Sequence, residues 1–474
     1  MLSRDQVQAF ALPIMERFGT PGLGVAVVSG DESLALGLGV RDARDGGAVD
    51  ADTTFQLASC SKAYTATAAA LLVDAGVLAW DDPVRKHLPE FRMHDERLSG
   101  LATLRDLLSM RLGYRNQGVV NWGRNPELGV EVIFERLRHM PVIAGFREAF
   151  TYLNPAYILM AEVIARASGR PFADQLRDDV SAPLGQERTF VRGGRLQPTT
   201  PHAFPHVDLD AEIRPLGMAY CGGQPGESCV YSSANDAVPW LRLHLNAGEI
   251  GGRRLVSRCA MGEMHRPHVL GPPVPELDHH VLAYAMGWQR RDTPHGPILL
   301  HEGAEFGVAT FTILDEARKS GVAVYANLGS APAVKAIGYG LIDRLARRQP
   351  RPWADIFERV AADFDAATEA AGAAQLARRA QPAPPMSEIT GSYFHPANGM
   401  IDLSPASDGL DVRVRDAWVY DAVAAPLGDN LFGGPFRFAG MRGLTPRGLR
   451  LRVFRDEQGL ALQAPGFGVA RKVA

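Results

Sequence analysis

The chain has 474 residues, which is too long for one typical hydrophobic core, so we expect two or three domains. Its 46% hydrophobic and 22% charged residues are ordinary for a soluble globular protein. The formal net charge is −3 and no block of Lys and Arg stands out, which argues against nucleic acid or an anionic membrane as the partner. No apolar run is as long as a membrane-spanning helix requires.

The first 20 residues and the cysteines both bear on the compartment. Asp5 and Glu16 fall within the apolar pattern of the N-terminus, which predicts an amphipathic helix and not a signal peptide. The cysteines form no CxxC or Cys/His metal spacing, so we expect scattered free thiols, with one disulfide left open: Cys60, Cys221, Cys229 and Cys259. The sequence therefore indicates a cytoplasmic protein.

The next elements follow from hydrophobic periodicity and turn residues. Residues 22–42 predict two strands around a turn at Ser29–Ser33. Helical periods ending near Gly or beginning near Ser predict helices over 61–78, 103–114, 154–170 and 232–250. Apolar, β-branched runs predict further strands over 297–316 and 320–329.

This order predicts an α+β fold, in which the N-terminal hairpin and the late strands share one antiparallel sheet flanked by helices and an all-helical subdomain. Residues 349–385 hold one predicted helix bracketed by proline, which is typical of a spacer. Beyond Pro385, about eight short alternating segments with glycine turns predict a small all-β barrel or sandwich. The predicted domains are therefore residues 1–345, a helical linker over 346–385, and residues 386–474.

The segment QLASCSK, residues 56–62, places Ser59 and Lys62 just before an alanine-rich helix. Three residues is about one helical turn, so the two side chains lie on the same face. A helix N-terminus favours an oxyanion, and a buried lysine loses its proton easily enough to act as a base for serine. The alternative is a solvated lysine on a helix surface, because this spacing also arises by chance.

A second segment, FTYLNPAY, contains Tyr152 and Asn154 where a loop enters a helix. The phenol can relay a proton between the serine and a leaving group, and the amide can hold a substrate carbonyl. Judged alone, the pair is better explained as a buried tyrosine beside an asparagine helix cap.

A third segment, LLHEGAEFGVATF, carries His301 and Gly303 on an apolar strand. Glycine allows a substrate backbone to lie against the strand, and the N–H of Ala304 could join that of Ser59 as an oxyanion donor. The alternative is an edge strand with a polar rim.

In this order, Ser-x-x-Lys, Tyr-x-Asn and His-x-Gly, the chain resembles the serine β-lactamase and penicillin-binding-protein-like superfamily, in its class C β-lactamase, D-aminopeptidase and esterase branch. The resemblance extends from residue 1 to about residue 345 and includes 103–114 and 230–241. The C-terminal β-domain is similar to the lipocalin-like domain that some members carry after a helical linker.

The resemblance implies a serine hydrolase that forms an acyl-enzyme on an amide or ester of a small molecule or peptide, without metal or organic cofactor. Ser59 attacks, Lys62 and Tyr152 move protons, and the remaining residues bind substrate or oxyanion: Asn154, His301, Gly303 and Ala304. Transfer of the acyl group to an amine, weak β-lactamase activity and a non-catalytic scaffold are the alternatives, and a homo-oligomer is left open. No Gly-x-Ser-x-Gly elbow, P-loop or HExxH motif supports a rival enzyme class.

Two features depart from the family pattern or compete with it. Many relatives have Lys-Thr-Gly where this chain has His301-Glu302-Gly303, and histidine is mostly neutral at pH 7. Strand neighbours point to opposite faces, so we expect Glu302 to face away from His301 and to pair with an arginine. The alternative is that its carboxylate reaches the rim of the cleft. Four histidines in a proline-rich stretch are interpreted as solvated loop residues in preference to a metal site: His265, His268, His279 and His280.

Overall fold

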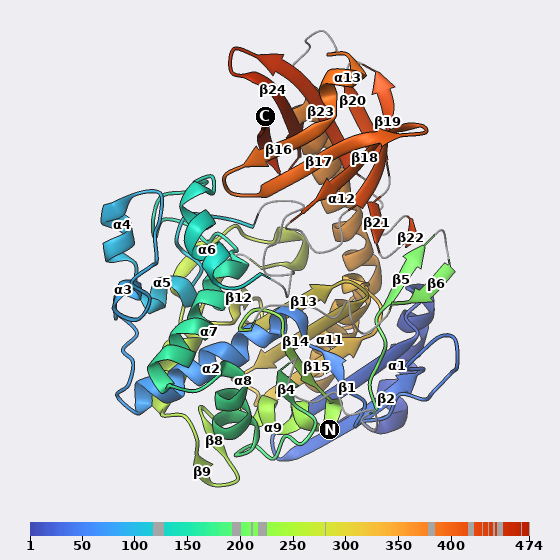
Figure 1. Ribbon diagram of the computed structural model, residues 1–474. Helices are drawn as coiled ribbons and strands as arrows, with labels where there is room; N and C mark the ends of the chain where they lie inside the picture. The colour runs from blue at the N-terminus through green and yellow to red at the C-terminus, as the bar shows by residue number, and fades with distance from the viewer. Residues whose placement is uncertain are drawn as a thin grey trace.

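The computed structural model shows a large α+β body and a smaller β-barrel joined by a long helix, α12 (Trp353–Ala377) (Figure 1). The residues that it describes are 1–116, 128–191, 201–209, 212–216, 225–279, 281–377, 384–415, 421–428, 430–434, 436–438, 441–442, 449–465 and 467–473. Cys221 and His280 lie outside these ranges.

The main sheet is antiparallel and joins the two ends of the α+β body. The hairpin of β1 (Gly22–Ser29) and β2 (Glu32–Gly39) pairs through β1 with β15 (Ser320–Ala326). The order β10-β11-β12-β13-β14-β15-β1-β2 is completed by β10 (Val269–Gly271), β11 (Val281–Tyr284), β12 (Gln289–Thr293), β13 (Gly296–Glu305) and β14 (Val308–Asp315). The predicted sharing of one sheet by the hairpin and the late strands is confirmed.

The two faces of this sheet bury separate hydrophobic cores. Val25 and Val27 of β1 pack with the helices α1 (Arg4–Arg17), α11 (Ala331–Leu345) and α12. Ala26 and Val28 point to the opposite face, which is covered by α2 (Ser61–Asp74) and α9 (Ala234–Leu245), with α10 (Arg258–His265) beside α2. This alternation, which follows from the period of two in a strand, decides which residues of β13 can reach α2.

Short helices form a subdomain next to α2 (Figure 1): α3 (Val84–His87), α4 (Glu96–Leu101), α5 (Leu104–Leu108), α6 (Glu131–Arg136), α7 (Asn154–Ser168) and α8 (Phe172–Gln175). The predicted helix over 103–114 is much shorter in the structure. It begins with a capping box between Thr103 and Asp106, but Met110 has a φ of 53°. This left-handed conformation is incompatible with continued α-helix, so the chain turns away after Leu108.

The C-terminal part closes into a barrel, as one of the two predicted architectures requires. Its eight barrel strands in the described ranges are β16 (Gly391–His395), β17 (Gly399–Ala406), β18 (Gly409–Val414), β19 (Asp421–Gly428), β20 (Leu431–Gly434), β23 (Leu449–Asp456), β24 (Gly459–Ala464) and β25 (Gly468–Lys472). The ring closes through β18–β19 and β16–β25 pairing. Tyr393, Val412, Leu451 and Leu462 fill its interior, so the barrel has its own hydrophobic core.

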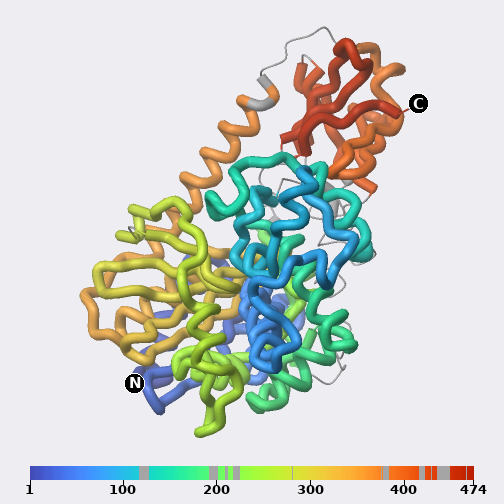
Figure 2. The backbone as a smooth tube through the Cα atoms, turned by 90° about the vertical axis from the view of Figure 1, so that its left-hand side faces the viewer, coloured from blue at the N-terminus to red at the C-terminus, as the bar shows by residue number. Residues whose placement is uncertain are grey.

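The barrel stands at the far end of α12, on the side of the helical subdomain (Figure 2). Glu369 of α12 forms an ion pair of 3.4 Å with Arg450 of β23. Burial lowers the pKa of His395 on β16, and His139, which follows α6, lowers it further. The ion pair joins the barrel to the helix that carries it, and the electrostatic effect of His139 indicates that the segment after α6 lies near β16.

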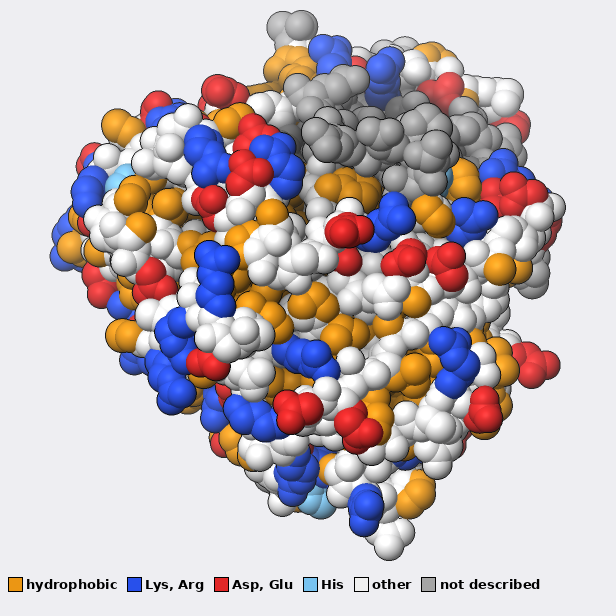
Figure 3. Space-filling model, turned by 90° about the horizontal axis from the view of Figure 1, so that it is seen from below, with side chains coloured by type: hydrophobic (Ala, Val, Ile, Leu, Met, Phe, Trp, Pro, Cys, Tyr) orange, Lys and Arg blue, Asp and Glu red, His pale blue; other side chains and the backbone are white. Residues whose placement is uncertain are grey.

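The surface and the helices bear on the predicted partners. Figure 3 shows Lys and Arg side chains interspersed with Asp and Glu over one face of the molecule. On this face, interspersed charges of both signs give no extended field of the kind that attracts a polyanion. None of the helices in the described part of the chain is long and apolar enough to cross a membrane.

The first turns of α12 belong to the core of the α+β body. Trp353 is 5% exposed, stacks 5.7 Å from Phe357, lies 4.8 Å from the ring of Tyr339, and donates a 2.7 Å hydrogen bond to Asp343. Trp353→Ala should therefore lower the free energy of unfolding by about 3–5 kcal/mol. Denaturant unfolding measures the change.

Phe364 on the same helix supplies the control, because it is 66% exposed. Phe364→Ala should change the free energy of unfolding by less than about 0.5 kcal/mol. If Trp353→Ala lowered the free energy of unfolding as little as Phe364→Ala, the start of α12 would be a spacer and not part of the core.

Candidate active site

Ser59 and Lys62 lie where a 3₁₀ turn, η1 (Ala58–Cys60), runs into α2. The Nζ atom of Lys62 is 2.9 Å from the Oγ atom of Ser59, so the spacing of three places the side chains together as predicted. Ala58, directly before the serine, has a φ of 47°. A non-glycine residue in this region is strained, and such strain occurs at functional sites where the surrounding structure holds the backbone in place.

Lys62 is completely buried, with 0% of its side chain exposed. Its Nζ atom also donates a 3.0 Å hydrogen bond to the carbonyl oxygen of Glu227, and the Oε2 atom of the Glu227 carboxylate is 3.8 Å away. Burial lowers the pKa of Lys62 to about 8, although Glu227 and Glu305 oppose the change. A substantial fraction of the amine is therefore neutral near pH 8 and can accept a proton.

The loop that contributes Glu227 is fixed to α2 by side chains of the helix. Thr65 donates a 2.7 Å hydrogen bond to the carbonyl of Gly226, and the hydroxyl of Ser61 accepts one of 3.0 Å from the N–H of Val230. Val230 begins β7 (Val230–Ser232), which pairs with β3 (Phe55–Gln56) just before Ser59. Sequence reasoning missed Glu227, because its distance of 165 residues from Lys62 leaves no local pattern.

Tyr152 lies on the other side of the serine and lysine pair. Its ring centre is 5.1 Å from the Nζ atom of Lys62. Burial raises the pKa of Tyr152, and its hydrogen bond with Ser59 opposes the rise. The phenol is therefore protonated at neutral pH and can donate a proton rather than act as a standing base.

Asn154 begins α7, and its side chain is buried. Asn116 holds this segment from both ends: its N–H donates to the carbonyl of Tyr152, and its Oδ1 atom accepts from the N–H of Asn154. The Oδ1 atom of Asn154 has no hydrogen-bond partner among the described residues. A buried amide oxygen in this state is suited to an N–H donor from a ligand.

His301 lies on β13, on the face of the sheet that carries α2, and is 1% exposed. Its Nδ1 atom is 2.8 Å from the carbonyl of Glu302, and its Nε2 atom is 3.2 Å from the hydroxyl of Tyr284. Burial lowers the pKa of His301 to about 3, and the charge of Lys62 contributes. The imidazole is therefore neutral, and its carbonyl contact assigns the proton to Nδ1.

Gly303 brings the end of β13 against the nucleophile. A Cβ atom at Gly303 would lie 2.5 Å from the carbonyl oxygen of Leu57 and 3.0 Å from the backbone nitrogen of Ser59. Thr310 on β14 donates a 2.7 Å hydrogen bond to the same carbonyl of Leu57, which fixes η1 to the sheet. Ala304, next along β13, is exposed, so its backbone lies at the open side of this contact.

Glu302 points to the opposite face, toward α11. It forms ion pairs with Lys335 of α11 and, at 3.9 Å, with Arg291 of β12. Burial would raise the pKa of Glu302, but Lys335 and Arg291 outweigh burial and hold the value at about 2. The predicted pairing with an arginine is confirmed, and a lysine shares the carboxylate.

Cys60, adjacent to the nucleophile, points into the sheet. Its Sγ atom contacts the carbonyl of His301 and the hydroxyls of Thr310 and Thr312, and burial raises the pKa of the thiol to about 11. A buried thiol that stays protonated is a poor nucleophile.

The prediction of solvated loop histidines was wrong for the residues that the structure describes. His265 and His279 are buried, and the side chain of His268 is 1% exposed. His265 is hydrogen bonded to His244 and Glu316, each at 3.0 Å. The proline-rich sequence around them resembled a loop, but His265 ends α10, and the connections that hold His268 and His279 are packed against the body of the protein.

The contact at Gly303 predicts the effect of a side chain there. Gly303→Val should lower kcat/KM for p-nitrophenyl acetate by more than about 100-fold, because the added methyl groups would crowd the backbone of Ser59 and the position of an oxyanion. Gly262→Ala on α10 is the matched control, since a Cβ atom there meets nothing within 4 Å. Normal activity of the valine variant would show that substrate does not use this side of Ser59.

Comparisons with known proteins bear on the family and the fold. A family model described as Beta-lactamase matches residues 7–359. The unguisins hydrolase ungD of Aspergillus violaceofuscus is 24% identical over 451 residues, which cover 88% of this chain and 79% of that protein. Penicillin-binding protein 4 of Amycolatopsis lactamdurans is 27% identical over 292 residues, which cover 60% of this chain and 75% of that protein.

A solved structure shares the fold over the whole length. The octameric penicillin-binding protein homologue from Pyrococcus abyssi has a TM-score of 0.66 and 18% identity, and the match covers 99% of this chain and 100% of that one. The family model covers the sheet, α2, α7 and β13, and with them every residue assembled around Ser59. The chain therefore belongs to the β-lactamase family.

Proposed function

We propose that the chain is a serine hydrolase that cleaves an amide or ester through an acyl-enzyme on Ser59. The observation that carries the proposal is the buried Lys62 amine, 2.9 Å from the Oγ atom of Ser59 and neutral in part near pH 8. Serine is a weak nucleophile until a neighbouring base takes its proton, and Lys62 is placed to do so.

The acylation step then uses residues on three sides of Ser59. The Oγ atom attacks the substrate carbonyl as its proton passes to Lys62, and the carbonyl oxygen becomes an oxyanion near the backbone of Ser59 and Gly303. The N–H groups of Ser59 and Ala304 are the proposed donors to this oxyanion. Tyr152, protonated and hydrogen bonded to Ser59, supplies the proton that the leaving group needs.

Substrate orientation is assigned to Asn154 and to the end of β13. The unpartnered Oδ1 atom of Asn154 suits an N–H group of an amide substrate. His301 is neutral and buried, so this position offers a substrate carboxylate no cation. Substrates without a carboxylate, such as amino-acid amides or simple esters, therefore fit the site better than penicillins, and D-aminopeptidase or esterase activity is the proposed type.

The barrel over residues 386–474 is proposed to influence which substrates reach the site. It lies beside the helical subdomain that contributes Tyr152 and Asn154, and its own core lets it act as a separate unit. Domains appended in this way often place loops over a shared cleft.

Ser59→Ala should abolish turnover of p-nitrophenyl acetate and covalent labelling by a fluorophosphonate, with an unchanged circular dichroism spectrum. The control is Cys60→Ala, which removes a buried neighbouring thiol and should keep both activities. Turnover of wild-type size in the Ser59 variant would exclude the proposed acyl-enzyme.

Lys62→Ala and Tyr152→Phe should each lower kcat by about 10²–10⁴, the range for loss of a general acid or base. Both variants should still bind a competitive inhibitor, because neither change closes the site. Full activity in Tyr152→Phe would leave Lys62 as the proton carrier and remove the phenol from the mechanism.

Nitrocefin should be a poor substrate, because its carboxylate would meet a neutral histidine and a nearby glutamate, Glu305. A panel of p-nitrophenyl esters and of D- and L-amino-acid amides, measured beside nitrocefin, ranks the substrate classes by kcat/KM. A value for nitrocefin of about 10⁶ M⁻¹s⁻¹ or more would contradict the preference for substrates without a carboxylate.

A further inference from the structure

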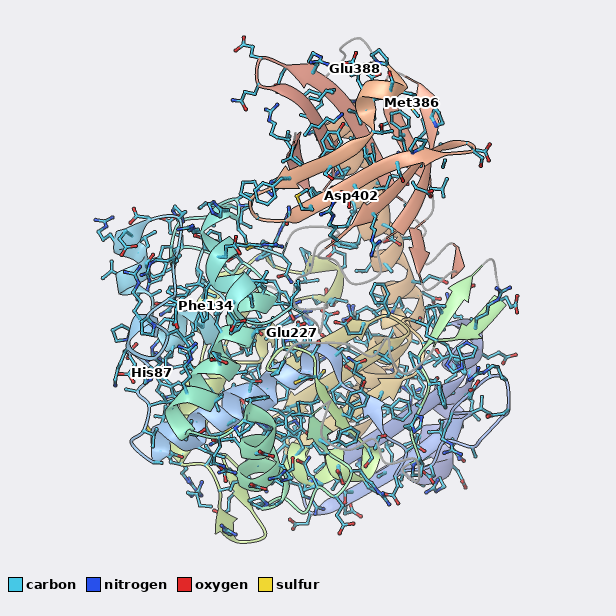
Figure 4. The ribbon with its side chains drawn as sticks, in the orientation of Figure 1. His87, Phe134, Glu227, Met386, Glu388 and Asp402 are labelled. Atoms are coloured by element: carbon cyan, nitrogen blue, oxygen red, sulfur yellow. The ribbon has the colours of Figure 1, made fainter. Side chains whose placement is uncertain are left out.

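We propose that Glu227 is a positioning residue that completes a Ser59–Lys62–Glu227 triad, in which its carboxylate stabilises the positive charge that Lys62 gains during acylation. The inference rests on the proposed function, because it assigns a role within the same acylation step. Glu227 lies at the junction of the helical subdomain and the sheet (Figure 4).

The contacts of Glu227 orient its carboxylate toward Lys62. Both Glu227 and Lys62 have side chains that are 0% exposed, so neither charge is shared with solvent. Ser228 donates a 3.1 Å hydrogen bond to the Oε1 atom of Glu227, while the Oε2 atom lies on the lysine side, 3.8 Å from Nζ. The backbone carbonyl of Glu227 accepts the 3.0 Å hydrogen bond from Lys62, which holds the amine close to the carboxylate of the same residue.

The chemistry of acylation creates a charge at this position. As the bond forms between the Oγ atom of Ser59 and the acyl carbon, the Oγ–H proton passes to the neutral amine and the carbonyl electron pair moves to its oxygen. Lys62 then carries a full positive charge although its side chain is completely buried. A buried ammonium is costly unless a carboxylate or several dipoles compensate it, and Glu227 supplies the negative charge.

The resting distance fits a contact that tightens during the reaction. At 3.8 Å, the Oε2 and Nζ atoms are too far apart for a hydrogen bond, as expected for a carboxylate beside an amine that is neutral for part of the time. Catalytic contacts are often long in a resting enzyme and shorten when the charge develops. The third member of a Ser-His-Asp triad acts on its base in the same way.

Other titratable groups face Lys62, and they determine the direction of the expected change. Burial lowers the pKa of Lys62, whereas Glu227, Glu305, Cys60 and Cys229 raise it, in that order. Tyr152 and Tyr157 present their rings, and neutral His301 lies beyond them. Removing the charge of Glu227 therefore makes Lys62 easier to deprotonate, but also a weaker base.

The test is the pH dependence of acylation in Glu227→Gln. The rate of fluorophosphonate labelling and kcat/KM for p-nitrophenyl acetate are measured from about pH 5 to about pH 10, around the pKa of the buried amine. The acidic limb should move down by about one pH unit or more, as expected for loss of an opposite charge within 4 Å. The rate on the alkaline plateau should fall by at least about 10-fold, because a weaker base accepts the serine proton less readily.

Two variants separate this role from a merely structural one. Glu227→Asp keeps the charge and should return the acidic limb toward the wild-type position. Glu302→Gln is the matched control: it removes a carboxylate on the opposite face of β13 and should leave the limb unchanged. If Glu227→Gln does not fold, Glu227→Met, of similar length and no charge, provides the same measurement.

An acidic limb that stays in place in the uncharged variant, or a plateau that does not fall, overturns the triad. This failure is distinct from failure of the proposed function. If Ser59→Ala still turns over substrate, the acyl-enzyme itself is excluded, whereas a normal requirement for Ser59 with an unmoved limb excludes only the role of Glu227.

Discussion

The burial of the Lys62 amine is the constraint on which the rest of the site depends. An amine with no exposure must find its hydrogen bonds inside the protein, and two are present, to the Ser59 hydroxyl and the Glu227 carbonyl. To supply them, the turn before α2 and the loop before β7 must meet, and Thr65 and Ser61 of α2 hold that loop in place. The same burial that requires these contacts also lowers the pKa of Lys62 into the range where it can act as a base.

The sheet forms the second side of the site, because β13 and β14 pack against the turn that contains Ser59. Because side chains alternate along β13, His301 and Gly303 face α2 while Glu302 faces α11. One strand therefore separates the face that carries Ser59 and Lys62 from a charged network of Glu302, Lys335 and Arg291. The ion pairs with Lys335 and Arg291 hold the Glu302 carboxylate on the far face of the sheet.

Sequence reasoning succeeded where chemistry is encoded by local spacing. Ser59 and Lys62 are one turn apart, and the alternation of β13 correctly sent Glu302 away from His301. It failed where tertiary contacts decide the outcome. Glu227 and Asn116 reach the site from distant segments, and α5 ends early because Met110 adopts a left-handed conformation. The histidines around α10 looked like loop residues because proline marks loops, yet their neighbours bury them.

The site also has a thermodynamic cost that the rest of the fold must offset. The pKa of Lys62 falls from 10.5 to about 8 on folding, so the unfolded chain binds the extra proton more tightly. Below pH 8 the folded protein carries the full penalty of a buried ammonium, of the order of a few kcal/mol, and the penalty fades as the pH rises from about 8 to about 10.5. Net stabilities of folded proteins are only about 5–15 kcal/mol, so this penalty is considerable, and burial in the two cores of the sheet must offset it. A large, doubly covered sheet is thus what allows a reactive lysine to stay buried beside its serine.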